Sequence, residues 1–423
     1  MIIFYISFFI IFLCSHLFLR NTYLIKIDPF IYIIFHSSLV VASVIHEYTS
    51  IFWGDIFIVL LSHIFFISGM RVSHRIFIKK STTIFKTHSF FKLKNNNSNN
   101  YLISIYCVLY IILAMYVGIT LGFLLFSEDP EAYKLQFLSG GMGIIWRITV
   151  ALSLPMIFFV LVYWSRSNKI ERLISVIAMV TCIISSGKSI LLTIFICYLL
   201  SVLYKTIIFG ETIRQSYFKY VFMVLFAFAF AIYTLNLAYG EAGFEIVLEL
   251  FLERITTAAG LGLTTYLNNH TYFDQKLPND VFTFFWNYLV VPFAGPLRLV
   301  DYVPTLGREI GIYITGGENY GPNPSVFLEG IFYFGNFFCF IYVFIIGIFI
   351  TFIRYSGLIF ARKFGPHIGA LGFVYFYNAA LSLSTDFLVF FALISSYVAF
   401  LFFAYCLSKI RFIIYFSIKS AAT

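Results

Sequence analysis

Residues 327–353 read FLEGIFYFGNFFCFIYVFIIGIFITFI, and this stretch contains one charged side chain, Glu329. A helix rises about 1.5 Å per residue, so the stretch is longer than the roughly 30 Å hydrocarbon core of a bilayer. It therefore predicts a membrane-spanning helix.

The composition extends this prediction to the whole chain. Hydrophobic residues make up 61% of the 423 residues and charged residues 11%, whereas soluble proteins are about a quarter charged. Apolar stretches long enough to span recur along the sequence, while a β-barrel would show short alternating segments. We expect an all-α, polytopic membrane protein with about 11 transmembrane helices. They are expected near 2–19, 28–46, 51–69, 101–126, 144–164, 172–186, 189–207, 218–238, 327–353, 366–383 and 387–407.

The distribution of basic residues predicts the orientation. The link at 70–100 carries seven Lys and Arg residues and no acid, so the positive-inside rule places it in the cytoplasm. With alternating spans, the cytoplasmic links and the C-terminal tail hold 21 of the 28 basic residues but few acids, among them Asp28. The net charge of +9 therefore indicates a basic inner face against an anionic lipid bilayer, and no nucleic-acid partner.

This orientation divides the chain into three expected domains. Residues 1–238 form an N-terminal bundle of about eight spans, and residues 327–423 form about three further spans that end in the cytoplasm. Between them lies a large external segment, residues 239–326. Long connections held by a rigid scaffold tend to carry function, so we expect the functional site there.

Two pieces of the external segment have apolar faces. Four glutamates recur every four residues beside an apolar face, which predicts an amphipathic helix on the membrane surface: Glu241, Glu245, Glu249 and Glu253. At 280–298 an apolar stretch is interrupted by Pro292 and Gly295. It is too short to span, and it predicts a re-entrant or interfacial piece.

A polar, helix-breaking string, GGENYGPNPS at 316–325, precedes the span at 327–353. Its glycines and prolines let the backbone approach a ligand. Hydroxyl and amide groups suited to sugar hydroxyls come from Asn319, Tyr320, Asn323 and Ser325.

Three further polar residues of this region are candidates. A carboxylate at membrane depth is a functional-site hypothesis, so Glu329 is one candidate acid; the alternative is a charge at the headgroup level. Glu318 is the second, with a solvated loop acid as its alternative. His270 could act as a base or contact sugar, although a lone loop histidine is more often structural.

Four basic residues outside the cytoplasmic links form a candidate phosphate site: Arg254, Arg298, Arg308 and Lys188. Guanidinium groups match phosphate oxygens in a bidentate manner, and several of them could hold a pyrophosphate. The alternatives are local ion pairs, such as Arg308 with Glu309, and a snorkelling position for Lys188. The GKS at 187–189 is no P-loop, because Cys182 stands where its first glycine belongs.

The six cysteines lie singly in apolar stretches, without a CxxC pair or a His/Cys cluster. We therefore expect neither disulfides nor a metal site. No histidine inside an expected span begins an HxxxD motif, and the match at His270 and Asp274 lies in the external segment, which argues against an intramembrane acyltransferase.

The sequence resembles the Wzy-type O-antigen polymerases, which join oligosaccharide repeat units. The resemblance lies in the architecture, in SSGKSILL at 185–192, and in GPNPSVFLEGIFYFGNF at 321–337. The last is similar to that family's Pro-Ser, Glu, Phe-Gly series at the start of a late span. The related O-antigen ligases carry a His-Asn pair where this sequence has Asn323-Pro324, which disfavours the ligase alternative.

The resemblance implies a membrane-embedded, metal-independent glycosyltransferase of the GT-C type, without a cofactor. It would polymerise undecaprenyl-pyrophosphate-linked oligosaccharides at the periplasmic face of a bacterial inner membrane, with a chain-length regulator protein as partner. The four basic residues would hold the pyrophosphate, and Glu329 or Glu318 would be the base. A lipid-linked oligosaccharide flippase or transporter is the remaining alternative, although no internal repeat supports it.

Overall fold

The computed structural model describes residues 2–25, 28–47, 49–87, 101–126, 143–186, 189–211, 260–290, 305–316 and 324–385, and isolated positions within 225–252 and 387–402. The described residues are overwhelmingly helical and contain no strand, which confirms the all-α class. Five of their helices are long and apolar enough to cross a membrane: Ile2–Thr22, Trp53–Phe77, Ile103–Phe126, Ile190–Ile208 and Val326–Lys363.

The helices of the N-terminal half follow the expected spans closely. They are α1 (Ile2–Leu19), α2 (Ile31–His46), α3 (Trp53–Thr87), α4 (Tyr101–Leu121), α6 (Gly143–Tyr163), α7 (Lys169–Ser186) and α8 (Ser189–Ile208). Short 3-10 turns follow three of them: η1 (Arg20–Thr22), η3 (Leu124–Phe126) and η4 (Trp164–Arg166). The main difference is α3, which continues to Thr87 although its span was expected to end at 69. No proline or glycine interrupts residues 70–87, so the helix extends into the basic link.

The second half contains short helices followed by two long ones. The short ones are α11 (Leu261–Asn268), α12 (His270–Lys276), α13 (Val281–Phe285), the π-helical turn η5 (Trp286–Val290) and α15 (Leu306–Thr315). The long ones are α16 (Val326–Lys363) and α17 (Gly365–Leu383). The expected spans at 218–238 and 387–407 and the expected amphipathic helix around 241–253 lie largely outside the described residues.

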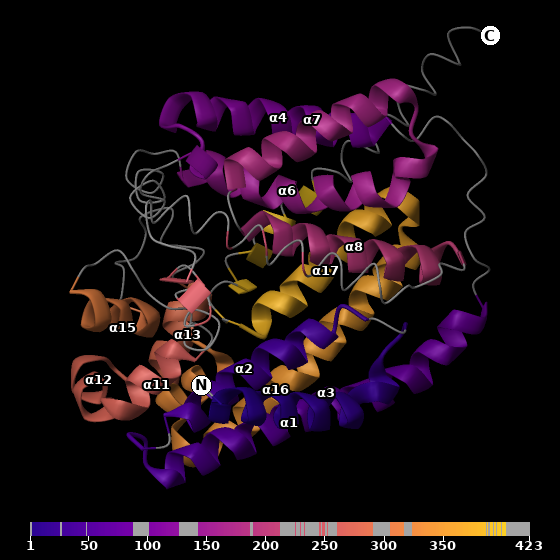
Figure 1. Cartoon of the computed structure of the whole chain (residues 1–423). Helices are drawn as coiled ribbons and strands as arrows, with labels where there is room; N and C mark the ends of the chain where they lie inside the picture. Colours follow the sequence, from indigo (N-terminus) through magenta and orange to yellow (C-terminus); the bar gives the residue numbers. More distant parts are fainter. Residues whose placement is uncertain are drawn as a thin grey trace, which may run out of the picture.

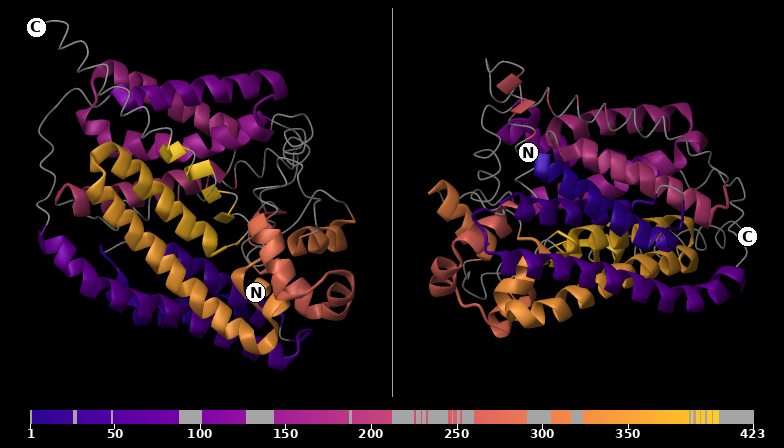
Figure 2. Two further views of the ribbon diagram at one scale, coloured as in Figure 1. Left: turned by 180° about the vertical axis from the view of Figure 1, so that it is seen from behind. Right: turned by 60° about the horizontal axis from the view of Figure 1, so that its bottom comes forward.

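The long helices lie side by side, and the short helices gather at one end of them (Figure 1). Helices α4 and α7 form one side, followed by α6 and α8, then α17, then α16 packed on α3, with α1 and α2 next to α3. Turned views show the same order, with α11, α12, α13 and α15 beside the beginning of α16 (Figure 2). These short helices belong to residues 239–326, the segment that was expected to be external.

Helices α3 and α16 touch backbone to backbone through two glycines. A Cβ atom at Gly69 would overlap the carbonyl oxygen of Phe344, and one at Gly347 would overlap that of Phe66. The close approach lets Ser73 donate to the carbonyl oxygen of Ile348 at 3.1 Å across the two helices. Lipid gives no hydrophobic drive for helix association, so small residues and interhelical hydrogen bonds of this kind stabilise the pair.

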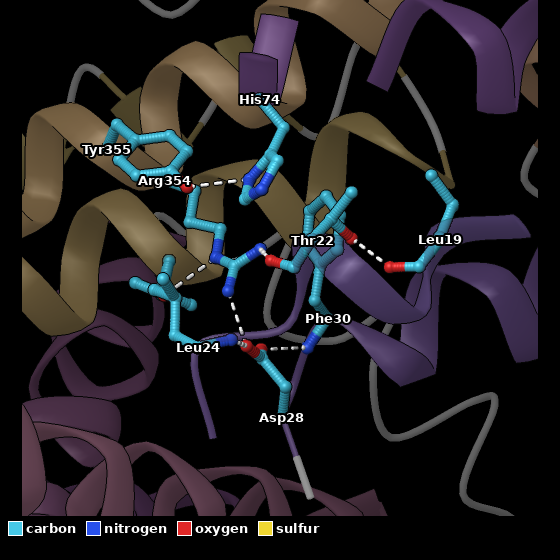
Figure 3. A network of polar contacts seen from close by, with 9 residues as sticks. Leu19, Thr22, Leu24, Asp28, Phe30, His74, Arg354 and Tyr355 are labelled. Atoms are coloured by element: carbon cyan, nitrogen blue, oxygen red, sulfur yellow. Dashed lines mark hydrogen bonds and ion pairs between the residues drawn. The ribbon is translucent and has the colours of Figure 1, made fainter. Parts of the chain in front are cut away.

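A buried ion pair ties the link between α1 and α2 to α16 (Figure 3). The guanidinium of Arg354 contacts the carboxylate of Asp28, and both side chains are fully buried. Arg354 also donates to the hydroxyl of Tyr377 at 2.9 Å and to the carbonyl oxygen of Thr22 at 3.2 Å, and it lies 4.4 Å from the ring centroid of Phe30. Each of the three guanidinium nitrogens therefore donates a hydrogen bond, and a buried charge requires such partners.

The carboxylate of Asp28 is equally well satisfied. Its oxygens accept from the backbone N–H groups of Leu24 at 2.8 Å and Phe30 at 2.9 Å. Next to Arg354 along α16, the hydroxyl of Tyr355 is hydrogen-bonded to Nδ1 of His74 at 2.7 Å, so α3 is joined to the same cluster (Figure 3).

Helix α16 is kinked at Gly335, whose φ of 69° and ψ of 175° are not helical. A positive φ is strained for residues with a Cβ atom but costs glycine little. The kink separates a first part, residues 326–334, from a second part that begins at Asn336. The stretch at 327–353 was expected to form one span, and the break at Gly335 was not predicted.

Candidate functional site

The short helices are fastened to one another by polar contacts. Lys276 on α12 forms an ion pair of 2.6 Å with Glu309 on α15, and Tyr313 donates to Oδ1 of Asn269 at 2.8 Å. The neighbouring carboxylate of Glu309 and the hydroxyl of Tyr272 raise the pKa of the Lys276 ammonium group. Helix α15 is thus held against α11 and α12, and Arg308 is carried with it.

The beginning of α16 is set by its N-cap. Ser325 has an extended backbone, and its Oγ accepts from the backbone N–H of Leu328 at 3.3 Å. This is the usual capping contact of a serine, and a glutamate in the first turn, here Glu329, adds a favourable interaction with the helix dipole. The hydroxyl of Ser325 is therefore engaged within the protein, and its side chain is buried.

Glu329 is fully buried inside this end of the molecule. Its Oε2 accepts from the hydroxyl of Tyr342 at 2.9 Å, and its Oε1 accepts from the backbone N–H of Phe387 at 3.3 Å. The rings of Phe284 and Phe334 surround Tyr342, with centroids 5.6 and 4.7 Å from it. A carboxylate in such apolar surroundings depends on its hydrogen-bond donors, so these contacts hold the side chain in one place.

A polar cavity of about 500 Å³ lies between the start of α3, the short helices and the kink of α16. Its polar lining consists of two carboxylates, one imidazole and two amides, and its walls are largely aromatic. The lining residues are Asp55, Tyr266, Leu267, His270, Asp274, Asn279, Ile331, Phe332, Tyr333, Phe334, Gly335 and Asn336.

One internal hydrogen bond orders this lining. The hydroxyl of Tyr266 donates to Oδ1 of Asp274 at 3.1 Å. Burial, and next the negative charge of Asp274, raise the pKa of Tyr266, so the phenol keeps its proton and remains a donor.

A second cavity, an apolar groove of about 860 Å³, runs along the second part of α16. It is lined by side chains of α13, η5, α16 and the residues after α17, nearly all of them aromatic or aliphatic. They include Phe285, Leu289, Phe338, Ile341, Ile345, Phe349, Phe390 and Ile394.

Tyr333 and Phe334 line both cavities and form the wall between them. They belong to the last turn of α16 before the kink, one turn beyond Glu329. A single molecule with a polar head and a long apolar tail can therefore contact both cavities at this wall. The arrangement suits an amphipathic, lipid-linked ligand.

The structure places four of the predicted site residues. His270 lines the polar cavity, Glu329 lies buried beside its wall, Ser325 caps α16, and Arg308 is half-buried on α15. Glu309, the suggested local partner of Arg308, forms an ion pair with Lys276. The other predicted site residues lie outside the described residues: Lys188, Arg254, Arg298, Glu318, Asn319, Tyr320 and Asn323.

Sequence reasoning missed four polar residues of the cavity, Asp55, Asp274, Asn279 and Asn336. Asp55 had a usable signal, because it is an acid at the mouth of a long apolar stretch, as Glu329 is. The other three had none. Asp274 and Asn279 lie in an ordinary polar stretch, and Asn336 faces the cavity because of the kink at Gly335.

Within the described ranges, no three His, Cys, Asp or Glu side chains come together in a way that could hold a metal ion. Comparison with known proteins gives no relative: no family model matches the chain, and neither does a curated protein or a solved structure.

Proposed function

We propose that the protein is a membrane glycosyltransferase that polymerises lipid-linked oligosaccharide repeat units. It transfers a growing saccharide chain from its undecaprenyl pyrophosphate carrier onto a sugar hydroxyl of an incoming lipid-linked repeat. The site lies at the periplasmic face of a bacterial inner membrane, with the C-terminus in the cytoplasm and a chain-length regulator protein as partner. The asymmetric distribution of basic residues supports this orientation.

The observation that carries the proposal is the pair of cavities on either side of Tyr333 and Phe334. A polyprenyl-linked saccharide has a long apolar tail and a hydroxyl-rich head. The apolar groove offers the tail a continuous surface of aromatic and aliphatic side chains, while the polar cavity offers the head carboxylates and amides. The burial of each part in matching surroundings is favourable.

The transfer breaks one bond and forms another. The acceptor hydroxyl oxygen attacks the anomeric carbon of the donor sugar, the bond from that carbon to pyrophosphate breaks, and pyrophosphate leaves with the electron pair. Cationic side chains stabilise the charge that develops on the leaving group. In this scheme Arg308, Lys188, Arg254 and Arg298 take that role, and no metal is needed for it.

A base must accept the proton of the acceptor hydroxyl. Glu329 is the proposed base, with Glu318 as the second candidate acid. The carboxylate of Glu329 is enclosed by Tyr342 and Phe387, so it has to be uncovered when the acceptor binds. Its position one helical turn from Tyr333 keeps that movement short. The neighbouring polar groups Asn319, Tyr320, Asn323, Ser325 and His270 are proposed to contact the sugars.

The test is a polymerisation assay with the purified protein in nanodiscs. The substrate is an undecaprenyl-pyrophosphate-linked repeat unit, and the products are separated by size. A ladder of longer lipid-linked saccharides is expected. Release of free lipid pyrophosphate without a ladder would contradict polymerisation. In a second reaction with lipid A core added as an acceptor, transfer onto that core alone would also contradict polymerisation and would indicate a ligase.

Variants of the apolar groove show whether the lipid tail binds there. Ile345→Trp fills the groove and should raise the substrate concentration needed for half-maximal rate by about tenfold, the effect of losing good apolar contacts. Ile119→Trp, on the exposed face of α4, is the matched control and should leave the ladder unchanged.

A further inference from the structure

The polar cavity carries more acidic than basic groups. Asp55 and Asp274 each contribute a carboxylate, and His270 is the single basic side chain among the described residues of the lining. Even a protonated His270 leaves an excess of one negative charge. The described part of the lining therefore presents a net negative charge to a ligand.

Most of the polar groups in the lining are open to a ligand. The carboxylate of Asp55, the ring of His270 and the side-chain amides of Asn279 and Asn336 make no hydrogen bond with any residue that the structure describes. Asp55 and His270 are near enough to interact electrostatically. These groups supply both acceptors and donors, which is the combination that sugar hydroxyls use.

The remaining wall is aromatic. Tyr266 and Phe332 meet edge to face with centroids 5.6 Å apart, and Phe332 meets Tyr333 in the same way at 4.8 Å. Such rings are flat, rigid and apolar, so they suit the C–H face of a sugar ring while the amides and carboxylates contact its hydroxyls. The volume of about 500 Å³ is within the range of small-molecule sites.

We propose that this cavity binds an uncharged or amine-bearing sugar of the acceptor saccharide and excludes groups that carry a carboxylate or a phosphate. Asp55 and Asp274 determine this specificity. The pyrophosphate of the donor therefore binds outside the cavity. The assignment of this sugar to the acceptor saccharide rests on the proposed function. The preference for uncharged or cationic sugars rests on the lining of the cavity alone.

The preference is measured by direct binding and does not depend on transferase activity. The probes are three methyl glycosides of one ring form: methyl N-acetylglucosaminide, which is neutral, methyl glucosaminide, which carries an amine, and methyl glucuronide, which carries a carboxylate. Saturation-transfer NMR on the purified protein in nanodiscs reports their binding. The neutral and amine-bearing glycosides should bind, and the glucuronide at least about tenfold more weakly, the effect of like charges a few ångströms apart in a wet site.

The double variant Asp55→Asn, Asp274→Asn keeps the shape of the cavity and removes its charge. It should bind the glucuronide and the neutral glycoside with affinities within about twofold of each other. Asp280→Asn is the matched control, since Asp280 caps α13 outside the cavity and asparagine caps equally well. The control should keep the wild-type preference.

Two results would overturn the proposal. One is a wild-type protein that binds none of the three glycosides, and the other is a wild-type protein that binds the glucuronide as well as the neutral glycoside. If the preference is found but no polymer forms in the assay with lipid-linked repeats, the cavity proposal stands and the proposed polymerase function is wrong.

Discussion

The hydroxyl of Tyr342 donates a hydrogen bond of 2.9 Å to Oε2 of Glu329, and this contact joins the two parts of α16 across the kink at Gly335. The acid lies before the kink and its donor lies beyond it. The bond therefore stabilises the angle between the two parts, and with it the wall of Tyr333 and Phe334 that both cavities share.

Replacement of Glu329 and of its donor should separate a chemical role from a structural one. Glu329→Gln keeps the size of the side chain but removes its charge and basicity, so the protein should fold and insert while polymerisation falls by at least about 100-fold, as for loss of a general base. Tyr342→Phe removes one hydrogen-bond donor from the buried carboxylate of Glu329 and should lower the free energy of unfolding by about 1–3 kcal/mol.

Polymer length on gels and thermal unfolding in detergent measure the two effects. Glu171→Gln, in the exposed N-terminal turn of α7, serves as the control and should change neither. Normal polymer from the Glu329→Gln protein would show that Glu329 is not the base, and Glu318 would then be the remaining candidate.

The close contact of α3 and α16 should not tolerate a side chain at its glycines. Gly347→Val places two methyl groups against the carbonyl oxygen of Phe66 and should cost about 1–3 kcal/mol or more through overpacking. Phe337→Leu, on an exposed position of the same helix, should be close to neutral. A detergent melting curve compares the two, and equal midpoints would argue against the backbone contact.

The buried pair of Arg354 and Asp28 should be costly to break from one side. Arg354→Met leaves a buried carboxylate without its cation and should destabilise the protein by about 3–5 kcal/mol. The double variant Asp28→Asn, Arg354→Met removes both charges and should recover a large part of this loss. Thermal unfolding of the single and double variants gives the coupling, and additive losses would contradict the ion pair.

The orientation can be tested with single cysteines in intact cells. A cysteine in place of Gln275, exposed on α12, should react with an impermeant thiol reagent. A cysteine in place of Ser165, exposed in the link between α6 and α7, should react only after the membrane is permeabilised. The background is a Cys14→Ser protein, because Cys14 is the exposed cysteine among the described residues. The opposite labelling pattern would invert the topology.

The sequence predicted the existence and most of the ends of the long helices, because apolar stretches with polar interruptions have few other solutions in a membrane. The span expected at 2–19 coincides with α1, and that at 189–207 differs from α8 by one residue. The re-entrant or interfacial piece expected at 280–298 is helical in α13 and the π-helical turn η5 up to Val290, and its remainder lies outside the described residues.

The polar cavity could not be predicted, because it depends on contacts between distant residues. Asp55 and His270 are more than two hundred positions apart in sequence. Asn336, which lines the same cavity, directly follows the kink at Gly335. For the same reason Asp28 was interpreted as an acid beside a cytoplasmic link, although it is the buried partner of Arg354. The pattern of charges predicts on which side of the membrane a residue lies, but it does not predict which side chain that residue contacts.

The distance in sequence between Asp28 and Arg354 has a consequence for biosynthesis. Translation delivers Asp28 to the membrane long before the ribosome has made Arg354. Until then, the carboxylate between α1 and α2 lacks this cation. The late helix α16 then neutralises the early loop. A chain that terminates before residue 354 lacks this cation altogether, so the carboxylate of Asp28 has no Arg354 to pair with.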